Sequence, residues 1–274
     1  MTPPAFLGHG VSRDLSGAVA LSIVVEDYHK IYGETVAVQG ISFRVEPGEV
    51  LGLIGPNGAG KTTTLRALAG ILTPTRGRII VAGHDLAIDP VAAKQALCYV
   101  PDDPKLFDTL TVWEHFRFIA SAYRLDDGWT ERAETLLDQF ELTEKKGALA
   151  SELSRGMRQK VAIGCGFLHD PTAILLDEPL TGLDPRGIRT MKQTVRARAD
   201  AGASVMVSSH LLSLVEDICT SVLMFHRGRV ILSGTLEQLA RTAAEEGRSE
   251  TLEDLFLRLT EADKPEKILE VKGL

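Results

Sequence analysis

Cysteine is scarce in this sequence, and long apolar runs are absent from it. The three cysteines, Cys98, Cys165 and Cys219, are far apart and lie in no CxxC or mixed Cys/His pattern, which argues against disulfides and structural zinc and favours reduced thiols. No run of about 18 or more apolar residues exists, so we expect no membrane-spanning helix. Residues 1–21 lack the basic start and apolar stretch of a signal peptide. We therefore expect a loose N-terminal leader and a cytoplasmic location.

An excess of positive charge is also missing. Lysine and arginine total 30 against 37 aspartates and glutamates, which gives a net charge of −7. Proteins that bind DNA or RNA usually carry a basic surface, so we expect no nucleic-acid partner. With 274 residues, 44% of them apolar, the chain is long enough to bury a substantial core.

The chain alternates short apolar blocks with helical patterns, as an α/β domain does. Apolar blocks broken by Gly and Pro up to Ile54 predict β-strands, and the spacing of Leu65, Leu68 and Leu72 predicts a helix after them. A mainly helical segment over about residues 102–168 follows. The blocks AILLD, SVMVSS and VLMFHRGRVILSG then return around a predicted helix, and this β–α–β order predicts a largely parallel sheet.

The segment GPNGAGKT fits the phosphate-loop pattern GxxxxGK[ST], and it lies between a predicted strand and a predicted helix. Backbone N–H groups and the helix dipole favour an anion at such a place. The Lys61 ammonium would reach the β and γ phosphates, and the Thr62 hydroxyl would ligate Mg²⁺. An ordinary glycine-rich turn would leave this Lys-Thr pair unexplained. The predicted nucleotide-binding residues of the loop are Gly55, Pro56, Asn57, Gly58, Ala59, Gly60, Lys61, Thr62 and Thr63.

A second motif, the acidic segment AILLDEP, follows about a hundred residues further along the chain. Its apolar residues predict a buried strand, and Asp177 at the end of that strand is a candidate magnesium ligand. Glu178 comes next and is placed to polarise a water for attack on the γ phosphate, which makes it the candidate general base. A solvated acid at a strand end is the alternative.

These motifs, together with the polar segment LSRGMRQK, make the sequence resemble the ATP-binding subunit of an ABC transporter over residues 22–235. LSRGM stands where that family has its signature sequence, and LTGLD (residues 180–184) resembles its D-loop. His210 in SSHLL resembles the switch histidine, and Tyr32 in KIYG resembles the aromatic residue that stacks on adenine. The resemblance implies an ATPase that uses ATP and Mg²⁺, with Lys61, Glu178 and His210 as its catalytic residues.

The resemblance also implies a fold and a domain organisation. We expect a P-loop NTPase core with a mainly parallel sheet, an N-terminal antiparallel β subdomain and an inserted helical subdomain at about residues 102–168. The ATPase domain would cover residues 22–235, and a helical extension would follow over residues 236–274.

In the family, the signature of one subunit closes over the ATP held by another. By this resemblance Ser154, Gly156 and Asp184 would contact nucleotide in a pair with a second copy or a paralogue, a homodimer being expected. Taken without the family, LSRGM predicts only a helix N-cap. His210 would then be a structural or exposed histidine, and Tyr32 an ordinary core or turn aromatic.

The sequence departs from the family pattern at two places. Asp102 occupies the position of the usual glutamine, where a shorter, charged side chain would ligate Mg²⁺ differently or fail to reach it. Arg155 and Met157 replace the usual glycine and glutamine of the signature. That variation, with the tail LEDLFLRLT, resembles the ABC-2-type subgroup that energises export of drugs, antibiotics or polysaccharides.

The resemblance implies a separate integral membrane permease, with this chain held at the cytoplasmic face of the membrane. The permease would dock near Asp102 and the predicted helix over residues 112–123, where Trp113 and Phe116 are candidate contacts and candidate core residues alike.

Three other functions share part of this motif pattern. A soluble ABC-type ATPase that acts as an assembly or mechanical factor keeps all the motifs and differs only in lacking a membrane partner. A GTPase or small-molecule kinase keeps the phosphate loop, but the sequence has no guanine-reading NKxD segment. A regulator that binds nucleotide without hydrolysis is disfavoured because the candidate catalytic residues are present.

Overall fold

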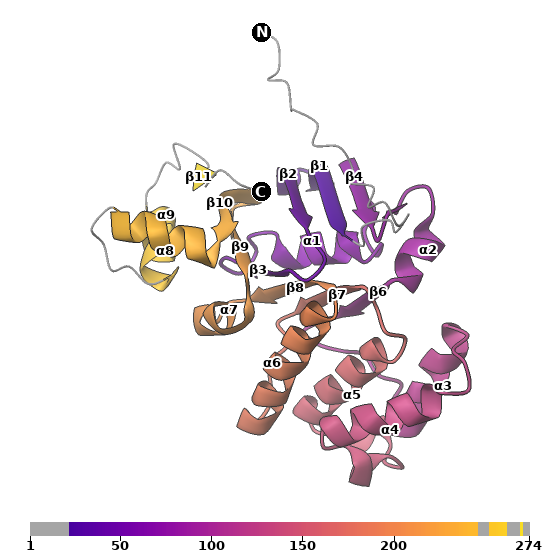
Figure 1. The fold of residues 1–274 in the computed structure, drawn as a ribbon. Coiled ribbons are helices and arrows are strands. Elements are labelled where there is room, and N and C mark those ends of the chain that lie inside the picture. The colour runs from indigo at the N-terminus through magenta and orange to yellow at the C-terminus, as the bar shows by residue number, and fades with distance from the viewer. Residues whose placement is uncertain (1–21, 246–251, 262–268, 271–274) are drawn as a thin grey trace, which may run out of the picture.

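Two β-sheets organise the chain, and helix α1 (Lys61–Leu68) lies between them (Figure 1). In this computed structural model, residues 22–245, 252–261 and 269–270 are described. The expected leader over residues 1–21 lies outside the described residues, as do parts of the expected C-terminal extension. No helix among the residues that the structure describes is long and apolar enough to cross a membrane.

The larger sheet has seven strands in the order β11-β10-β9-β3-β8-β7-β6. All its neighbouring pairs are parallel except β9 with β10, which is antiparallel. The prediction of a mainly parallel sheet is therefore confirmed. Its strands are β3 (Val50–Ile54), β6 (Leu97–Val100), β7 (Ala173–Asp177), β8 (Ser204–Ser209), β9 (Ser221–His226), β10 (Arg229–Thr235) and β11 (Leu269–Glu270).

The smaller sheet is antiparallel and has the order β2-β1-β4-β5. It comes almost entirely from the N-terminal part of the chain, so the predicted antiparallel β subdomain is confirmed. Its strands are β1 (Ile23–Tyr32), β2 (Thr35–Val45), β4 (Arg76–Val81) and β5 (His84–Asp85), and the short helix α2 (Pro90–Gln95) follows β5.

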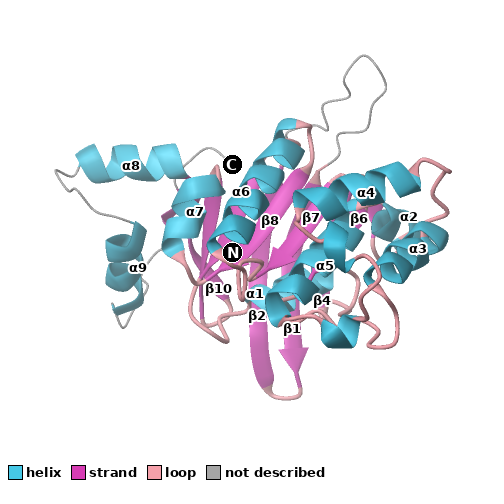
Figure 2. Ribbon diagram, turned by 90° about the horizontal axis from the view of Figure 1, so that it is seen from below, coloured by secondary structure: helices cyan, strands magenta, loops and turns pink. Residues whose placement is uncertain are grey.

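The strands of the larger sheet are buried on both faces, which explains their continuous apolar runs. In β3, Leu51 and Leu53 pack in one core with α1 and the smaller sheet, whereas Val50 and Ile54 pack in a second core with the helices beyond the sheet. Figure 2 shows those helices across the opposite face of the sheet. They are α5 (Arg155–Phe167), α6 (Pro185–Asp200) and α7 (Leu212–Ile218).

The segment between β6 and β7 is helical, as predicted. A capping box of Thr111 and Glu114 starts α3, because each residue satisfies a free backbone N–H of the other. Phe116 on α3 is fully buried, and a Cβ added at Gly164 of α5 would lie 2.8 Å from the Phe116 ring. Phe116 is thus a core residue that joins two helices. The other elements here are α3 (Val112–Ala122), α4 (Trp129–Gln139) and two 3₁₀ helices, Thr143–Lys145 and Ala150–Glu152.

The chain beyond β10 continues as α8 (Leu236–Glu245) and α9 (Leu252–Glu261). Helix α9 packs near α7, where Leu255 and Phe256 contact the second core as partly buried side chains. The described part of the extension is therefore mainly helical, as predicted, but it also contains the short strand β11, which pairs with β10.

A partly buried histidine joins the helical segment to the sheet. The ring of Tyr123, at the C-terminal end of α3, stacks on that of His169 with centroids 3.9 Å apart, and His169 Nε2 donates a hydrogen bond to Leu97 O at 3.3 Å. Its Nδ1 is buried without a hydrogen-bond partner. Burial lowers the pKa of His169 to about 4, because an ionised ring would lose its hydration there.

This histidine predicts an acid-sensitive contribution to stability. The unfolded chain takes up the proton near pH 6.5 and the folded chain only near pH 4, so the stabilisation is complete above this window and is lost as pH falls through it. We expect a loss of about 2 kcal/mol from this group, allowing for partial exposure of the ring. Urea denaturation at pH 7 and pH 4.5 measures it. His169→Gln should lose less stability between the two pH values, and an equal loss would contradict the assignment.

Candidate functional site

The loop between β3 and α1 wraps tightly because its glycines adopt conformations that other residues rarely take. Gly55 has φ 151°, and a Cβ there would lie 2.3 Å from Phe225 O. Gly60 has φ 114°, and its Cβ would lie 2.9 Å from Ala37 O. Both positions therefore need glycine. Gly60 is also the N-cap of α1 and has no side chain to satisfy the free N–H groups of the helix, which leaves them available to an anion.

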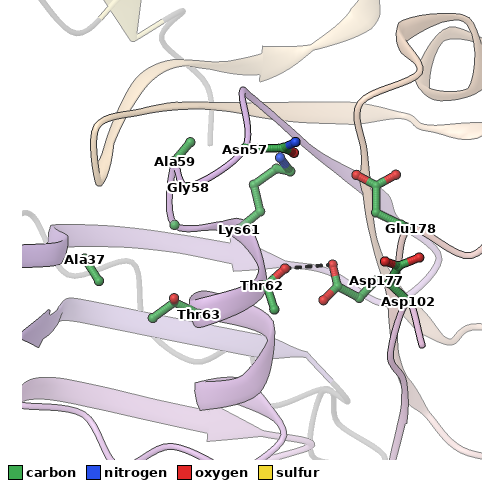
Figure 3. Close-up of a pocket in the computed structure, with 11 residues that line it drawn as sticks. Ala37, Asn57, Gly58, Ala59, Lys61, Thr62, Thr63, Asp102, Asp177 and Glu178 are labelled. Carbon is green, nitrogen blue, oxygen red and sulfur yellow. Dashed lines mark hydrogen bonds between the residues drawn. The ribbon is translucent and has the colours of Figure 1, made fainter. Parts of the chain in front are cut away.

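A pocket of 210 Å³ opens beside this loop (Figure 3). The loop and α1 form one side of it, and residues that follow β6 and β7 form the other. Such a position, at the carboxyl ends of parallel strands, is where α/β sheets bind ligands. The lining residues are Ala37, Asn57, Gly58, Ala59, Gly60, Lys61, Thr62, Thr63, Asp102, Asp177 and Glu178.

Lys61 is the only basic side chain among the described residues that line this pocket. It is 6% exposed, and its ammonium donates hydrogen bonds to Gly55 O at 2.6 Å and Pro56 O at 3.2 Å. Burial lowers the pKa of Lys61, while Glu178 and Asp177 oppose that shift. Figure 3 shows the two carboxylates on the other side of the pocket from the lysine. The lysine would attract a polyanion that bound between it and the two carboxylates, whereas the carboxylates would repel it. Binding would therefore require a cation that neutralises this repulsion.

Asp177 is almost fully buried, and its carboxylate accepts hydrogen bonds from three hydroxyl groups. Its Oδ1 accepts from Thr62 Oγ1 at 3.2 Å and from Ser208 Oγ at 2.5 Å, and its Oδ2 accepts from Tyr99 OH at 3.4 Å. Burial, followed by the charge of Asp177, raises the pKa of Tyr99, so its phenol stays a donor. Three donors fix the orientation of this carboxylate.

The oxygen atoms of Thr62 and Asp177 suit Mg²⁺. They lie within hydrogen-bond distance of each other at the pocket wall, and Mg²⁺ is usually held by one or two such protein ligands, with water and substrate phosphates completing its coordination. Among the described residues, no group of three or more His, Cys, Asp or Glu forms a metal cage. The site thus fits a magnesium ion that arrives with a phosphate ligand.

Glu178 lines the pocket, and His210 contacts it from outside the lining. The Nδ1 atom of His210 is 2.8 Å from Glu178 Oε2, where it can donate a hydrogen bond. The Glu178 side chain is 17% exposed and that of His210 is 59% exposed, so the glutamate is the more buried of the two. Glu178 has φ 48°, a conformation that costs free energy in a residue with a Cβ and is typical of functional sites.

The segment LSRGMRQK begins helix α5, and its basic residues pair with acids from other loops. Ser154 caps the helix by accepting a hydrogen bond from Met157 N at 3.3 Å. The remaining contacts join the helix to the loops around the pocket. They include Arg155 with Asp102 at 3.3 Å, Arg158 with Asp108 at 2.9 Å and Lys160 with Asp184 at 3.2 Å.

The two departures from the family pattern therefore contact each other. Asp102 and Arg155 form an ion pair in which both side chains are about half exposed. Such a pair adds little stability, but it partly neutralises a third carboxylate at the pocket wall.

The structure brings most of the predicted site residues into one pocket and leaves the others outside its lining. Gly55 and Pro56 contact the pocket lysine instead, and His210 reaches the pocket through Glu178. Tyr32 is 45% exposed at the end of β1, with the Lys30 ammonium 5.0 Å from its ring centre. Ser154, Gly156 and Asp184 lie around the start of α5 and α6.

Sequence analysis missed Tyr99 and Ser208, the two further donors to Asp177. Ser208 lies near the end of the predicted strand SVMVSS, and the carboxyl ends of parallel strands meet at one edge. The strand β6 that carries Tyr99 was not predicted. Nothing in either residue's own neighbourhood indicated a role.

Comparisons with known proteins agree with this geometry. The family model described as ABC transporter matches residues 38–181. The ABC-type transporter ATP-binding protein EcsA of Bacillus subtilis (strain 168) is 36% identical over 240 residues, which cover 87% of this chain and 96% of that protein. The linearmycin resistance ATP-binding protein LnrL of the same organism is 34% identical over 215 residues, which cover 78% of this chain and 69% of that protein.

A solved structure titled as that of an ATP binding subunit of an ABC transporter superposes with a TM-score of 0.82 at 35% identity, covering 86% of this chain and 98% of its own. The similarity in sequence and in fold thus extends over nearly the whole described core. The chain belongs to the ABC transporter family and is an ATP-binding cassette of the kind that hydrolyses ATP to power transport.

Proposed function

We propose that this chain is the ATP-hydrolysing subunit of an ABC exporter, that it works at the cytoplasmic face of a membrane with a separate permease, and that it pairs with a second ATP-binding subunit around two ATP molecules. The single observation that carries the catalytic part is the pocket that unites Lys61, Thr62, Asp177 and Glu178. Export is supported by the subgroup pattern around Arg155 and by the similarity to a linearmycin resistance protein.

In this proposal the phosphate loop binds the triphosphate. The backbone N–H groups at the start of α1 and the Lys61 ammonium would hold the β and γ phosphates. Thr62 and Asp177 would hold Mg²⁺, which neutralises and orients the phosphates when bound. Tyr32, whose ring is exposed, would stack on the adenine. Asp102 lines the same wall and is a further candidate oxygen ligand.

Glu178 would act as the general base. Its carboxylate lines the pocket on the side opposite the phosphate loop (Figure 3), where it can accept a proton from a water that attacks the γ phosphate. His210, 2.8 Å from Oε2 of this carboxylate, would hold that water or the γ phosphate in place. The contact between the two residues lets the histidine position the base as well.

The start of α5 would complete the nucleotide site of a second subunit. Ser154 and Gly156 begin this helix outside the pocket of their own chain, and a helix N-terminus favours a phosphate. Asp184 would contribute from the neighbouring loop. ATP would thereby hold two subunits together, and hydrolysis would release them.

Two exposed aromatic side chains mark the surface that we propose for the permease. Phe107 is 54% exposed and Phe118 is 50% exposed, and their rings meet edge to face with centroids 5.5 Å apart. Phe118 lies on α3, and Phe107 lies on the loop that precedes α3. The same loop carries Asp102, so it connects this surface to the pocket wall. Exposed aromatic residues are enriched at protein interfaces, whereas the earlier candidate Phe116 is buried and Trp113 is partly buried.

This surface gives the test of the membrane partner. The double substitution Phe107→Ser and Phe118→Ser removes the exposed aromatic area, so we expect the fraction of the chain that sediments with washed membranes of its own host to fall by about tenfold, an effect of roughly 1.4 kcal/mol. The ATPase rate of the purified chain should stay within about twofold of the wild type, because neither ring lines the pocket.

The control is the double substitution Ile88→Ser and Val91→Ser, which removes two apolar side chains at the start of α2 that are 78% and 65% exposed, more than either phenylalanine. It should leave membrane association unchanged. If the wild-type chain never sediments with membranes, a soluble assembly ATPase replaces the transporter subunit as the better proposal. If both double variants lose association alike, the surface assignment is wrong.

A further inference from the structure

A buried serine at the end of β8 contacts both acidic residues of the candidate site. Ser208 is fully buried, and in the sheet register it lies beside Asp177 on one neighbouring strand and Leu53 on the other. Its strand is therefore the one between the phosphate-loop strand β3 and the strand β7 that carries the acids.

The two hydrogen bonds of the Ser208 hydroxyl have fixed directions. Its Oγ lies 2.5 Å from Asp177 Oδ1 and 3.1 Å from Glu178 N. An ionised carboxylate can only accept and a backbone N–H can only donate, so the hydroxyl donates its single proton to Asp177 and accepts from Glu178. One side chain thus links the carboxylate of the first acid to the backbone of the second.

The backbone contact lies at the strained residue of the site. Glu178 has φ 48°, and such a conformation persists only where the surroundings determine it. Its N–H is shared between Ser208 Oγ and Ser208 O, the latter at 3.2 Å. Ser208 therefore supplies both acceptors that hold this peptide in place, and the direction of the Glu178 side chain depends on that peptide.

The other two donors to Asp177 cannot replace this link. Thr62, whose Oγ1 is 3.2 Å from the carboxylate, is the residue whose hydroxyl would turn to Mg²⁺. Tyr99 contacts Oδ2 at 3.4 Å, which is long for a hydrogen bond between a hydroxyl and a carboxylate. Ser208 makes the shortest of the three contacts and is fully buried.

We propose that Ser208 is a positioning residue that aims the Asp177 carboxylate at the metal and, through the backbone, the Glu178 carboxylate at the attacking water. This inference rests on the proposed ATP hydrolysis at this site. Partners that orient metal ligands typically change metal affinity or activity by about 10- to 100-fold when they are removed.

The test compares Ser208→Ala with Ser204→Ala in the full chain. Ser204 is a matched control, because it is a fully buried serine at the other end of β8 whose hydroxyl donates to Val45 O at 3.3 Å, away from the pocket. Ser208→Thr, which keeps the hydroxyl, serves as the conservative variant. The first quantity measured is the ATPase turnover number. The second is the Mn²⁺ concentration that half-saturates the chain loaded with a non-hydrolysable ATP analogue, which electron paramagnetic resonance detects. The third is the affinity of the chain for that analogue in EDTA.

We expect Ser208→Ala to lower the turnover number by about 10- to 100-fold and to raise the half-saturating Mn²⁺ concentration about tenfold. The affinity measured in EDTA should stay within about twofold of the wild type, because Lys61 and the loop are intact. Ser204→Ala should match the wild type in all three, and Ser208→Thr should recover part of the loss.

Two results would overturn the inference while leaving the proposed function standing: wild-type turnover and metal affinity in Ser208→Ala, or equal losses in Ser204→Ala, which would indicate general damage to the strand. A wild-type chain that binds the analogue but neither binds Mn²⁺ nor hydrolyses ATP would overturn the proposed function, and this inference with it.

Discussion

Glu178→Gln is expected to lower the ATPase turnover number by about 10²- to 10⁴-fold, which is the usual contribution of a general base. The amide keeps the size of the side chain and can still contact His210, whose Nδ1 lies 2.8 Å from Oε2, but it cannot take up the proton of the attacking water. The backbone at φ 48° and its hydrogen bonds to Ser208 do not involve the carboxylate, so they should persist. Steady-state phosphate release measures the effect.

Lys61→Ala provides the contrasting variant. It removes the only basic side chain of the described pocket lining, so it should weaken nucleotide binding itself, whereas Glu178→Gln should keep the affinities for ATP and Mg²⁺. Equilibrium binding of a fluorescent ATP analogue separates the two. Wild-type turnover in Glu178→Gln would refute its assignment as the base, and unchanged nucleotide affinity in Lys61→Ala would refute the role of the lysine.

The same glutamine variant reports on the second subunit. Since it should bind ATP without consuming it, light scattering is expected to show a monomer that becomes a dimer when Mg-ATP is added. The further substitution Ser154→Arg, at the cap of α5 outside the pocket, should prevent that dimer. A variant that binds ATP and stays monomeric would show that the second half of each site comes from a different protein.

Local sequence was sufficient to predict those features of the fold and the site that depend on contiguous residues. The phosphate loop is one such case, because the conformations at Gly55 and Gly60, with φ 151° and 114°, depend on the absence of a Cβ and can be recognised from the glycines themselves. The parallel sheet is another, because strands buried on both faces have continuous apolar runs. The pocket that these features predict is the one found beside α1.

Contacts between residues that are distant in the chain could not be predicted from local sequence. Ser208 lies 31 residues from Asp177, and Arg155 lies 53 residues from Asp102. In each case both partners were visible in the sequence, but their pairing depends on strand order and on how the helical segment folds back. Arg155 and Asp102 therefore read as two separate departures from a family pattern, although in three dimensions they form one ion pair.

Helix α3 shows a different limit. Its period places Phe116 on an apolar face with Val112 and Ile119, but it does not say which other element that face packs against. Phe116 and Phe118 are two positions apart, which places them on nearly opposite faces of a helix, and the structure buries the first while leaving the second 50% exposed. The core is decided by the packing of Phe116 against Gly164 on α5, a contact that the sequence of α3 alone does not contain.

Gly156→Ala is expected to destabilise the chain and to lower ATP turnover at least about tenfold. Gly156 lies in the first turn of α5 with its backbone against the loop of residues 180–184, and a Cβ there would lie 2.3 Å from Gly182 O. The atom in the way is backbone, so the helix or the loop has to move, and overpacking of this kind typically costs about 1 to 3 kcal/mol. The higher helix propensity of alanine would return up to about 1 kcal/mol of that.

The matched control is Gly147→Ala, where an added Cβ meets nothing within 4 Å and φ lies outside the left-handed region. It should leave both the free energy of unfolding, measured in urea, and the ATPase rate near their wild-type values. Wild-type stability and turnover in Gly156→Ala would show that the loop adjusts without consequence and that the contact is dispensable.

The comparison of stability with activity also separates two reasons for a glycine at position 156. If the residue serves only the nucleotide of a second subunit, alanine should lower turnover and leave the free energy of unfolding of the isolated chain unchanged. If it serves the contact with Gly182 in its own chain, both quantities should fall together, because the displaced loop carries Asp184 and its ion pair with Lys160. The 2.3 Å distance between an added Cβ and Gly182 O favours the second outcome, because a displacement of either the start of α5 or the loop of residues 180–184 would then affect the other.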